Sequence, residues 1–400
     1  MGALKKKKRR SSKKFVLLTV IALVVASITL TMLFTNVISS AVNETTSVLL
    51  GLIPVAAEEG AYNGVISSTS SVFGVNHFAD KQREAVTVQQ QFCRDLAAGR
   101  VPVPASESSG SSKPLKIKQL MIDAAKLTGI DTIPSFPMTL YDGSDVVSGF
   151  VEGGGWEEGK IRSFAHIIQK YTKDHNMAVS DLTFVDIGAN VGWFTLLMAS
   201  TGVNVIAFEP MKQNHYVLGK TLCNPANKDL AERVTLFRTG LSNETATCLM
   251  YSENINVGDG VTKCVPDPAS FKPPPGYIVR GMIEVDRLDN ILDTNRHHIV
   301  AVKMDTEGSE AHVVAGGPKF FFQSQIDMLV TEFMPHGMML DRGGDPVAFV
   351  RSFLDAGYGL VSPTPGVYYS REAALNMNNF PNGADLAFKY IRPSAQQQQQ

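Results

Sequence analysis

Residues 184–195 read FVDIGANVGWFT, and this stretch decides the fold class. A run of β-branched and aromatic residues ends at Asp186, and a turn of small residues leads into an apolar, helix-compatible run. This order predicts a buried strand, a tight loop and the start of a helix. Gly188 and Gly192 let the backbone approach a ligand closely, and the helix start offers unpaired N–H groups. We therefore expect a ligand site at this loop.

A second apolar strand, predicted at 203–208, ends at Glu209. An acidic side chain about 20 residues past such a loop accepts hydrogen bonds from the ribose hydroxyls of a nucleoside cofactor. A dinucleotide would require Gly-x-Gly-x-x-Gly, which does not follow Gly188 here. Asp186 would repel a pyrophosphate but suits the cationic groups of S-adenosyl-L-methionine, the predicted cofactor. A strand–turn–helix unit of an unrelated α/β enzyme is the alternative. The residues expected to bind the cofactor are Asp186, Gly188, Asn190, Gly192 and Glu209.

Four sequence blocks agree in order and spacing with a known family. They are FVDIGANVGWFT, FEP at 208–210, VDRLD at 285–289 and VKMDTEGSE at 302–310. Together they resemble the FkbM-type methyltransferase family over roughly residues 148–335, although Met304 and Thr306 stand where aliphatic residues are more usual. The resemblance implies a Rossmann-like seven-stranded methyltransferase sheet with helices on both faces. It also implies S-adenosylmethionine-dependent O-methylation, often of sugar hydroxyls.

The pattern of the chain around these blocks alternates between strands and helices. Strands are predicted at 183–187, 203–208, 234–238, 299–304, 327–332 and 385–390, and helices at 160–172, 192–200, 213–221, 309–315 and 346–356. Such alternation predicts an α/β domain with a mostly parallel sheet, here over residues 114–395. Ligands of these sheets bind beyond the carboxyl ends of the strands. The acidic residues at or near such ends are Asp186, Glu209, Asp305 and Glu332.

Methyl transfer to a sugar hydroxyl needs a proton acceptor, because an alcohol is a poor nucleophile near neutral pH. The candidates are Asp305, Glu307, Glu310, Glu332 and His336. Asp305 ends the strand expected beside the one that ends at Asp186, so we expect it close to the transferable methyl group. Glu310 has the alternative role of capping a helix start, and His336 that of a solvated loop residue. The predicted catalytic residues are Asp305, Glu307 and His336.

The N-terminus predicts a membrane anchor. Residues 1–14 carry eight Lys or Arg side chains, and 15–35 contain no charged residue. A stretch of about 20 apolar residues spans a bilayer as one helix, and basic residues favour the cytoplasmic side. We therefore expect a single-pass type II membrane protein with its catalytic domain in the lumen of the Golgi or endoplasmic reticulum. A signal peptide cleaved near 39–41 is the alternative.

Residues 36–113 are rich in Ser and Thr and are predicted to form a stem or linker, within which 79–98 could form one helix. The glutamines at 396–400 are predicted to be a disordered tail. An anchor, a stem and a catalytic domain form the layout of many glycan-modifying enzymes of the Golgi, which is an argument by analogy.

Charge and cysteine usage narrow the range of partners. Removing the eight basic residues of the tail from the total of 37 leaves 29 basic against 38 acidic residues. This excess of acid argues against nucleic acid, whose phosphates need a basic face, and favours a neutral glycan or small molecule. The four cysteines show no Cys-x-x-Cys spacing, so no metal is expected. The expected disulfide is Cys248–Cys264, and buried free thiols are the alternative.

The leading hypothesis is a membrane-anchored O-methyltransferase that acts on a glycan or glycoconjugate. A methyltransferase of a lipid or protein side chain and a non-catalytic binding module that retains the fold are the alternatives. The joint presence of Asp186, Glu209 and Asp305 argues against the binding module, which would not need a full cofactor site. Acceptor recognition is expected in loops such as 253–280, where no motif identifies the acceptor.

Overall fold

A computed structural model describes residues 71–105, 114–143, 145–364 and 366–392. The predicted basic tail at 1–14, the anchor at 15–35 and the glutamine tail at 396–400 lie outside these residues. Among the helices of the described part, none combines the length and the apolar character needed to cross a bilayer.

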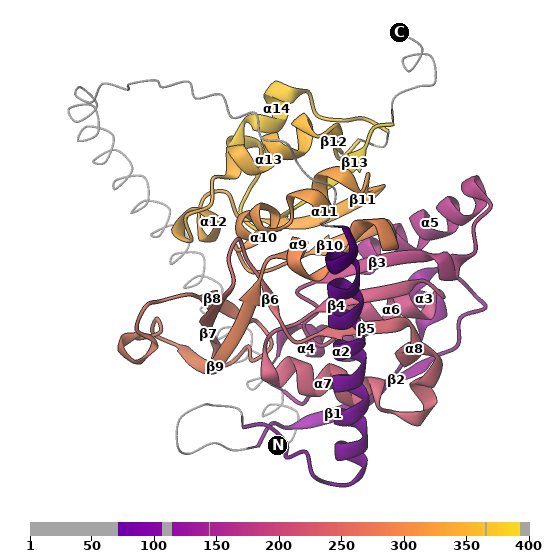
Figure 1. Ribbon diagram of the computed structural model, residues 1–400, viewed down its shortest axis with the longest axis vertical. Coiled ribbons are helices and arrows are strands. Elements are labelled where there is room, and N and C mark those ends of the chain that lie inside the picture. Colours follow the sequence, from indigo (N-terminus) through magenta and orange to yellow (C-terminus); the bar gives the residue numbers. More distant parts are fainter. Residues whose placement is uncertain (1–70, 106–113, 144, 365, 393–400) are drawn as a thin grey trace, which may run out of the picture. The chain divides into compact units, whose positions relative to one another are not determined.

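A seven-stranded sheet forms the centre of the α/β domain (Figure 1). In spatial order its strands are β12 (Tyr358–Leu360), β13 (Ala384–Tyr390), β11 (Met328–Phe333), β10 (His298–Met304), β3 (Leu182–Ile187), β4 (Asn204–Phe208) and β5 (Val234–Phe237). Within this sheet β13 runs antiparallel to the other six strands. The mixed α/β fold with a large sheet is confirmed, and six of the strands match their predicted positions. The short β12 was not predicted.

The strand order creates a crevice beside β3. From this central strand the chain adds β4 and β5 on one side, and it later returns to add β10 and β11 on the other. Ligands bind at such a reversal, outside the carboxyl ends of the strands. The ends of β3 and β10 lie side by side, because Met304 pairs with Ile187 and the Asp305 N–H donates to the Ile187 carbonyl at 3.0 Å.

Two hydrophobic clusters lie on opposite faces of the sheet. Along β3, Phe184 belongs to one cluster and Val185 to the other, as alternation along a strand requires. Helices α5 (Glu158–His175), α6 (Trp193–Ser200) and α7 (Lys212–Leu222) supply the first cluster, whereas α9 (Leu288–Ile291), α10 (Glu310–Gly316), α11 (Pro318–Gln323) and α13 (Pro346–Asp355) supply the second. The predicted helices on both faces are therefore confirmed.

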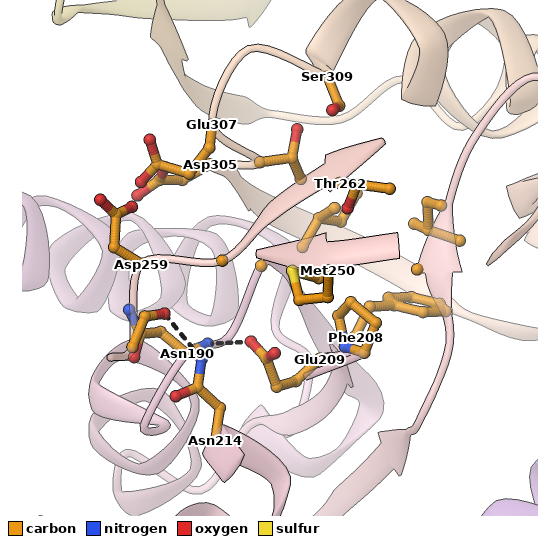
Figure 2. Close-up of a pocket in the computed structure, with 18 of the residues that line it drawn as sticks. Asn190, Phe208, Glu209, Asn214, Met250, Asp259, Thr262, Asp305, Glu307 and Ser309 are labelled. Atoms are coloured by element: carbon orange, nitrogen blue, oxygen red, sulfur yellow. Dashed lines mark hydrogen bonds between the residues drawn. The ribbon is translucent and has the colours of Figure 1, made fainter. Parts of the chain in front are cut away.

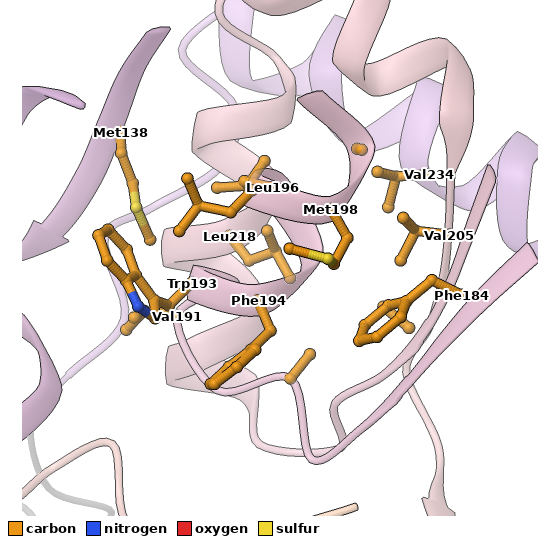
Figure 3. Packing of buried hydrophobic residues seen from close by; sticks show 14 of the residues in the cluster. Met138, Phe184, Val191, Trp193, Phe194, Leu196, Met198, Val205, Leu218 and Val234 are labelled. Atoms are coloured by element: carbon orange, nitrogen blue, oxygen red, sulfur yellow. The ribbon is translucent and has the colours of Figure 1, made fainter. Parts of the chain in front are cut away.

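Helix α6 is enclosed by other elements, which fixes the loop that precedes it. Each of its residues from Trp193 to Ala199 is buried, as expected of a helix that is apolar on all sides. Figure 3 shows Trp193 beside Met138, while Phe184 and Val205 of the sheet lie on the opposite side of the cluster. Burial of each such large side chain stabilises the fold by about 1.5–3 kcal/mol.

Residues 240–286 form a second sheet rather than plain loops. Its order is β6 (Gly240–Leu241), β9 (Tyr277–Asp286), β7 (Ala246–Glu253) and β8 (Val261–Lys263). The predicted disulfide Cys248–Cys264 is confirmed, and it joins β7 to the residue after β8. The turn between these two strands reaches the crevice of the large sheet, as the site below shows.

Part of the predicted stem belongs to the globular unit. Residues 71–97 form helix α2 (Ser71–Ala97), which packs against β5 and α7 (Figure 1, indigo). A disulfide joins Cys93 to Cys223 at the end of α7. The ring of Phe92 lies edge-on to that of Tyr216, and the guanidinium of Arg238 lies 5.1 Å from the centroid of the Phe92 ring. The helix predicted at 79–98 within the stem is therefore present as part of α2, and it packs on the domain.

The remaining elements are short. A hairpin of β1 (Ile117–Ile122) and β2 (Phe136–Tyr141) precedes the large sheet. The other α-helices of the described residues are α3 (Ala124–Thr128), α4 (Val146–Glu152), α8 (Lys228–Arg233), α12 (Met338–Asp341) and α14 (Arg371–Leu375).

Candidate active site

The glycine loop between β3 and α6 packs tightly against the end of β10. Gly188 has a φ of +80°, and a Cβ built on it would lie 1.8 Å from the carbonyl oxygen of Asp305. Gly192 has a φ of +89°, and its Cβ would lie 2.3 Å from Cδ1 of Leu218 in α7. Any larger residue would therefore push the loop away from its neighbours. Both glycines are required by close packing as well as by backbone conformation.

Glu209 joins the glycine loop to the segment after β4. Its carboxylate is buried, with 5% of the residue exposed, and accepts from the Asn190 N–H at 2.7 Å and from the Met211 N–H at 2.8 Å. Burial raises the pKa of Glu209 to about 7, although these hydrogen bonds oppose the rise. A carboxylate has about four acceptor positions, so further hydroxyl donors can bind to it.

A cleft of about 640 Å³, partly open to solvent, lies over these residues. One end has the carboxylate of Glu209, and the apolar surface comes from Phe208, Leu241 and Met250 (Figure 2). Of the residues predicted from sequence, the cleft wall contains Gly188, Asn190, Glu209, Asp305 and Glu307.

Asp186 and Gly192 do not line the cleft; they lie at the two ends of the glycine loop that forms part of its wall. Asp186 is fully buried and accepts from the Thr195 hydroxyl at 2.6 Å. The Lys303 ammonium lies 3.7 Å from Asp186, lies 3.5 Å from Asp305 and donates to the Gly188 carbonyl at 2.7 Å. Burial alone would lower the pKa of Lys303, but Asp305 and Asp186 raise it above its usual range. Lys303 therefore stays charged and ties the two strand ends together.

The opposite end of the cleft is acidic. The carboxylate oxygens of Asp305, Glu307 and Glu332 lie within 4.8 Å of one another. Figure 2 shows Asp259, from the β7–β8 turn, with its carboxylate facing this group. Burial, with added repulsion from Asp305, raises the pKa of Glu332 to about 9, and burial and contact with Asp259 raise that of Glu307. This acidic group can hold protons, and its spacing would also suit a bridging divalent cation.

The turn after β10 directs Glu307 into the cleft. Glu307 has a φ of +54°, a left-handed conformation that costs a residue with a side chain about 1–2 kcal/mol. Glu310 holds this turn, because its Oε1 accepts from the Thr306 N–H at 2.8 Å, the Thr306 hydroxyl at 2.9 Å and the Gly308 N–H at 3.3 Å. The structure thus gives Glu310 the supporting role that the sequence left open and places Glu307 at the cleft.

His336 lies elsewhere, which differs from its predicted role. It is exposed, its backbone N–H donates to Asn382 Oδ1 at 2.9 Å, and its Nε2 is 3.0 Å from the Met377 carbonyl oxygen. The chain after β11 turns toward the C-terminal segment, so this side chain is engaged outside the cleft. Of the three predicted catalytic residues, the structure brings Asp305 and Glu307 together and leaves His336 apart.

Sequence reasoning missed Lys303, Asp259 and Asn214. Asn214 accepts from the Tyr141 hydroxyl at 2.8 Å and donates to the Gly258 carbonyl at 2.9 Å, which fixes the β7–β8 turn at the cleft. A lysine inside the apolar run of β10 was a usable signal, because a buried lysine needs a partner. Asp259 and Asn214 had no such signal.

Comparison with known proteins identifies the family of this region. Residues 186–359 match the family model described as the methyltransferase FkbM domain, which confirms the predicted family over that range. A search of curated proteins gives no match.

Several solved structures are similar in part. A methyltransferase FkbM from Methylobacillus flagellatus KT has 18% identity and a TM-score of 0.33, over 56% of this chain and 48% of that one. The bifunctional kinase-methyltransferase WbdD has 10% identity and a TM-score of 0.33, over 67% of this chain and 46% of that one. Magnesium protoporphyrin IX methyltransferase from Synechocystis PCC 6803 has 12% identity and a TM-score of 0.27, over 59% of this chain and 88% of that one. The TM-scores of these three structures are too low to support any conclusion beyond the family match. The chain therefore spans about half the length of two of these three proteins.

Proposed function

We propose that the FkbM methyltransferase domain at residues 186–359 makes this protein an S-adenosylmethionine-dependent O-methyltransferase of a sugar hydroxyl in a glycan or glycoconjugate. The observation that carries the proposal is a single cleft with two chemically different ends. Glu209 and the glycine loop form a nucleoside-binding end, and Asp305 with Glu307 forms a proton-accepting end. A methyl transfer to an alcohol needs both.

The residues present fit the cofactor. Glu209 is buried with acceptor positions to spare, Gly188 lets the loop pack against the end of β10 at the cleft wall, and Phe208 offers apolar surface in the same cleft. Glu209 would hold the ribose hydroxyls, and the acidic wall would favour the positive charge of the sulfonium. When bound, S-adenosylmethionine supplies a methyl group that is already activated.

The protein's own contribution is to position the acceptor and remove its proton. Asp305 lines the cleft next to the glycine loop, and the Lys303 ammonium, 3.5 Å from its carboxylate, favours one orientation of that side chain. The acceptor hydroxyl would donate its proton to Asp305, and Glu307 and Glu332 beside it can share that proton. A positioned general base contributes about 10²–10⁴-fold to the rate.

A lumenal location belongs to the same proposal. All four cysteines form disulfides, Cys93–Cys223 and Cys248–Cys264. Disulfides persist in oxidising compartments and are rare in the cytosol. Together with the basic tail and the uncharged stretch at 15–35, this supports a type II anchor in the Golgi or endoplasmic reticulum.

The test uses the full chain, methyl-labelled S-adenosylmethionine and fractionated glycans as acceptors. The wild-type protein should transfer label to a saccharide fraction. Asp305→Asn keeps the shape and removes the charge, so it should bind the cofactor normally and lose about 10²-fold or more in turnover. His336→Gln, a change outside the cleft, serves as the comparison and should stay active.

Two results would contradict this assignment. Loss of cofactor affinity in Asp305→Asn would move Asp305 into the cofactor site, and full turnover would transfer the base role to Glu307. A wild-type protein that binds the cofactor but labels only lipid or protein fractions would exclude a glycan acceptor.

A further inference from the structure

A second pocket with basic side chains adjoins the acidic cleft. Its wall includes Lys263, His312 and Arg342, and it shares Leu241, Thr262 and Ser309 with the cleft. A ligand in the cleft can therefore extend into this pocket without leaving the surface. Nothing in the proposed methyl transfer accounts for the two cationic groups, Lys263 and Arg342, at this place.

Arg342 is half-buried and has no acidic partner among the described residues. Its Nη1 donates to the Ser309 hydroxyl at 2.9 Å and to the Thr262 carbonyl at 3.4 Å. Within the described part of the chain, its Nη2 contacts Met338 Sδ at 3.7 Å. His312 Nε2 is 2.7 Å from the Arg342 carbonyl oxygen and so helps to fix this residue. A partly desolvated charge without a counter-charge destabilises the free protein. A bound anion would offset that cost.

Lys263 adds a second positive charge at the end of β8. Its side chain is exposed and forms no ion pair within the described part of the chain. The acidic residue in the same wall, Glu244, is also exposed and is not paired with Lys263 or Arg342. The pocket thus keeps two free cationic groups in a chain whose other charges, apart from the N-terminal tail, are mostly acidic.

The cleft is acidic and the neighbouring pocket is basic. This difference in charge would orient a molecule that binds across both. Asp259 and Asp305 would repel an anion from the cleft, whereas Lys263 and Arg342 would attract it to the neighbouring pocket. A guanidinium with free N–H groups is suited to carboxylate, sulfate and phosphate oxygens. A neutral hydroxyl of the same molecule would then point toward Asp305.

We propose that this basic pocket binds an anionic group of the acceptor, so that the methyl acceptor is an acidic saccharide rather than a neutral one. The anion is a carboxylate, sulfate or phosphate, which share the same recognition by Lys263 and Arg342. This inference rests on the proposed methyl transfer to a glycan, and it replaces the neutral glycan favoured by overall charge.

The experiment measures binding to the full chain by calorimetry, with S-adenosylhomocysteine already bound. The probes are a hyaluronan tetrasaccharide for carboxylate, a chondroitin sulfate tetrasaccharide for sulfate, mannose 6-phosphate and inorganic phosphate for phosphate, and neutral chitotetraose as the reference. At least one anionic probe should bind about 10-fold or more tightly than chitotetraose. Lys263→Gln should remove about 10-fold of that affinity, the effect of losing one charge-assisted hydrogen bond.

The control is Lys319→Gln, which removes one exposed positive charge on α11, away from the pocket. It should leave anion binding unchanged, and neither variant should alter the affinity for S-adenosylhomocysteine. The pocket assignment is overturned if no anionic probe is preferred, or if the two lysine variants behave alike. Failure of the wild-type protein to bind S-adenosylhomocysteine would instead count against the proposed function itself.

Discussion

Lys303 is the residue that holds the two halves of the site in register. Its ammonium contacts the Gly188 carbonyl and lies between the carboxylates of Asp186 and Asp305. A buried ammonium is stable only when paired and hydrogen-bonded. Here the oxygen atoms that it contacts lie at the ends of β3 and β10, and the ring of Phe194 in α6 lies 5.5 Å from it. The position of the glycine loop relative to Asp305 therefore depends on one buried charge.

Glu209 should make cofactor binding depend on pH. Burial raises its pKa to about 7, and ribose hydroxyls donate to the ionised form. Cofactor binding then favours deprotonation, so the affinity should rise as the pH increases from about 6 to about 8 and level off above that. Glu209→Gln should bind about 10-fold more weakly at pH 8, because it loses charge-assisted hydrogen bonds. Calorimetry over this pH range measures both effects.

The dependence on pH must come from Glu209 for the assignment to hold. Glu209→Gln should therefore show a flatter profile between pH 6 and pH 8, while thermal unfolding confirms that the variant is folded. A profile of unchanged slope in Glu209→Gln would show that another group titrates and that Glu209 does not hold the ribose.

Residues with a local signal could be identified from the sequence. Gly188 and Glu209 follow predicted strands at fixed spacing, and Asp305 ends a strand within a specific motif. The supporting position of Asp186 could not be predicted, because it depends on Lys303 of another strand. Asp259 reaches the cleft from a turn distant in sequence, so only the tertiary fold reveals it.

At the scale of elements, the sequence predicts strands formed by long apolar runs. It does not predict short strands that form by pairing with distant parts of the chain. The runs that became β3, β4 and β10 are buried along nearly their whole length and read as continuous hydrophobic stretches. The second sheet, between Gly240 and Asp286, depends on pairing between distant strands, with β9 pairing to both β6 and β7. Such pairing leaves little trace in local sequence, which is why 253–280 was expected to be a loop.

Helix α2 lies against the edge strand of the large sheet. It packs on β5, which has no further strand beside it within the described sheet. Lys81 pairs with Asp286 at 2.8 Å, and Ala85 is buried in the second hydrophobic cluster. A helix covering a sheet edge protects it from pairing with other chains. Helix α2 (Ser71–Ala97) is therefore expected to contribute to the free energy of unfolding of the domain.

Loss of the Cys93–Cys223 disulfide should lower the free energy of unfolding by about 2–4 kcal/mol, because the bond restricts a long loop in the unfolded chain. Its two cysteines are 130 residues apart. The double variant Cys93→Ser with Cys223→Ser tests this by denaturant unfolding. Replacing the Cys248–Cys264 pair, which is separated by 16 residues, is the matched control and should have a smaller effect. Equal stability of wild type and the Cys93–Cys223 variant would mean that packing alone holds α2.

At the scale of the whole molecule, the charge distribution and the disulfides favour a catalytic domain in the lumen of the secretory pathway. The eight basic residues of the tail precede the uncharged stretch at 15–35, whereas the folded part carries two disulfides and an excess of acidic residues. A bilayer would separate these two parts and leave the disulfides on the oxidising side. Asn43, in the sequence Asn-Glu-Thr, would be available there for glycosylation.

This arrangement makes the topology testable on intact microsomes that contain the full chain. Added protease should leave the domain beyond residue 70 intact, because it would lie in the lumen, and should degrade it once detergent opens the membrane. A glycosidase should increase the mobility of the wild-type protein, and Asn43→Gln should reduce that shift through the loss of one glycan. Digestion of the domain without detergent would reverse the orientation. It would also remove the explanation for the disulfides, since a cytosolic domain would keep its thiols reduced.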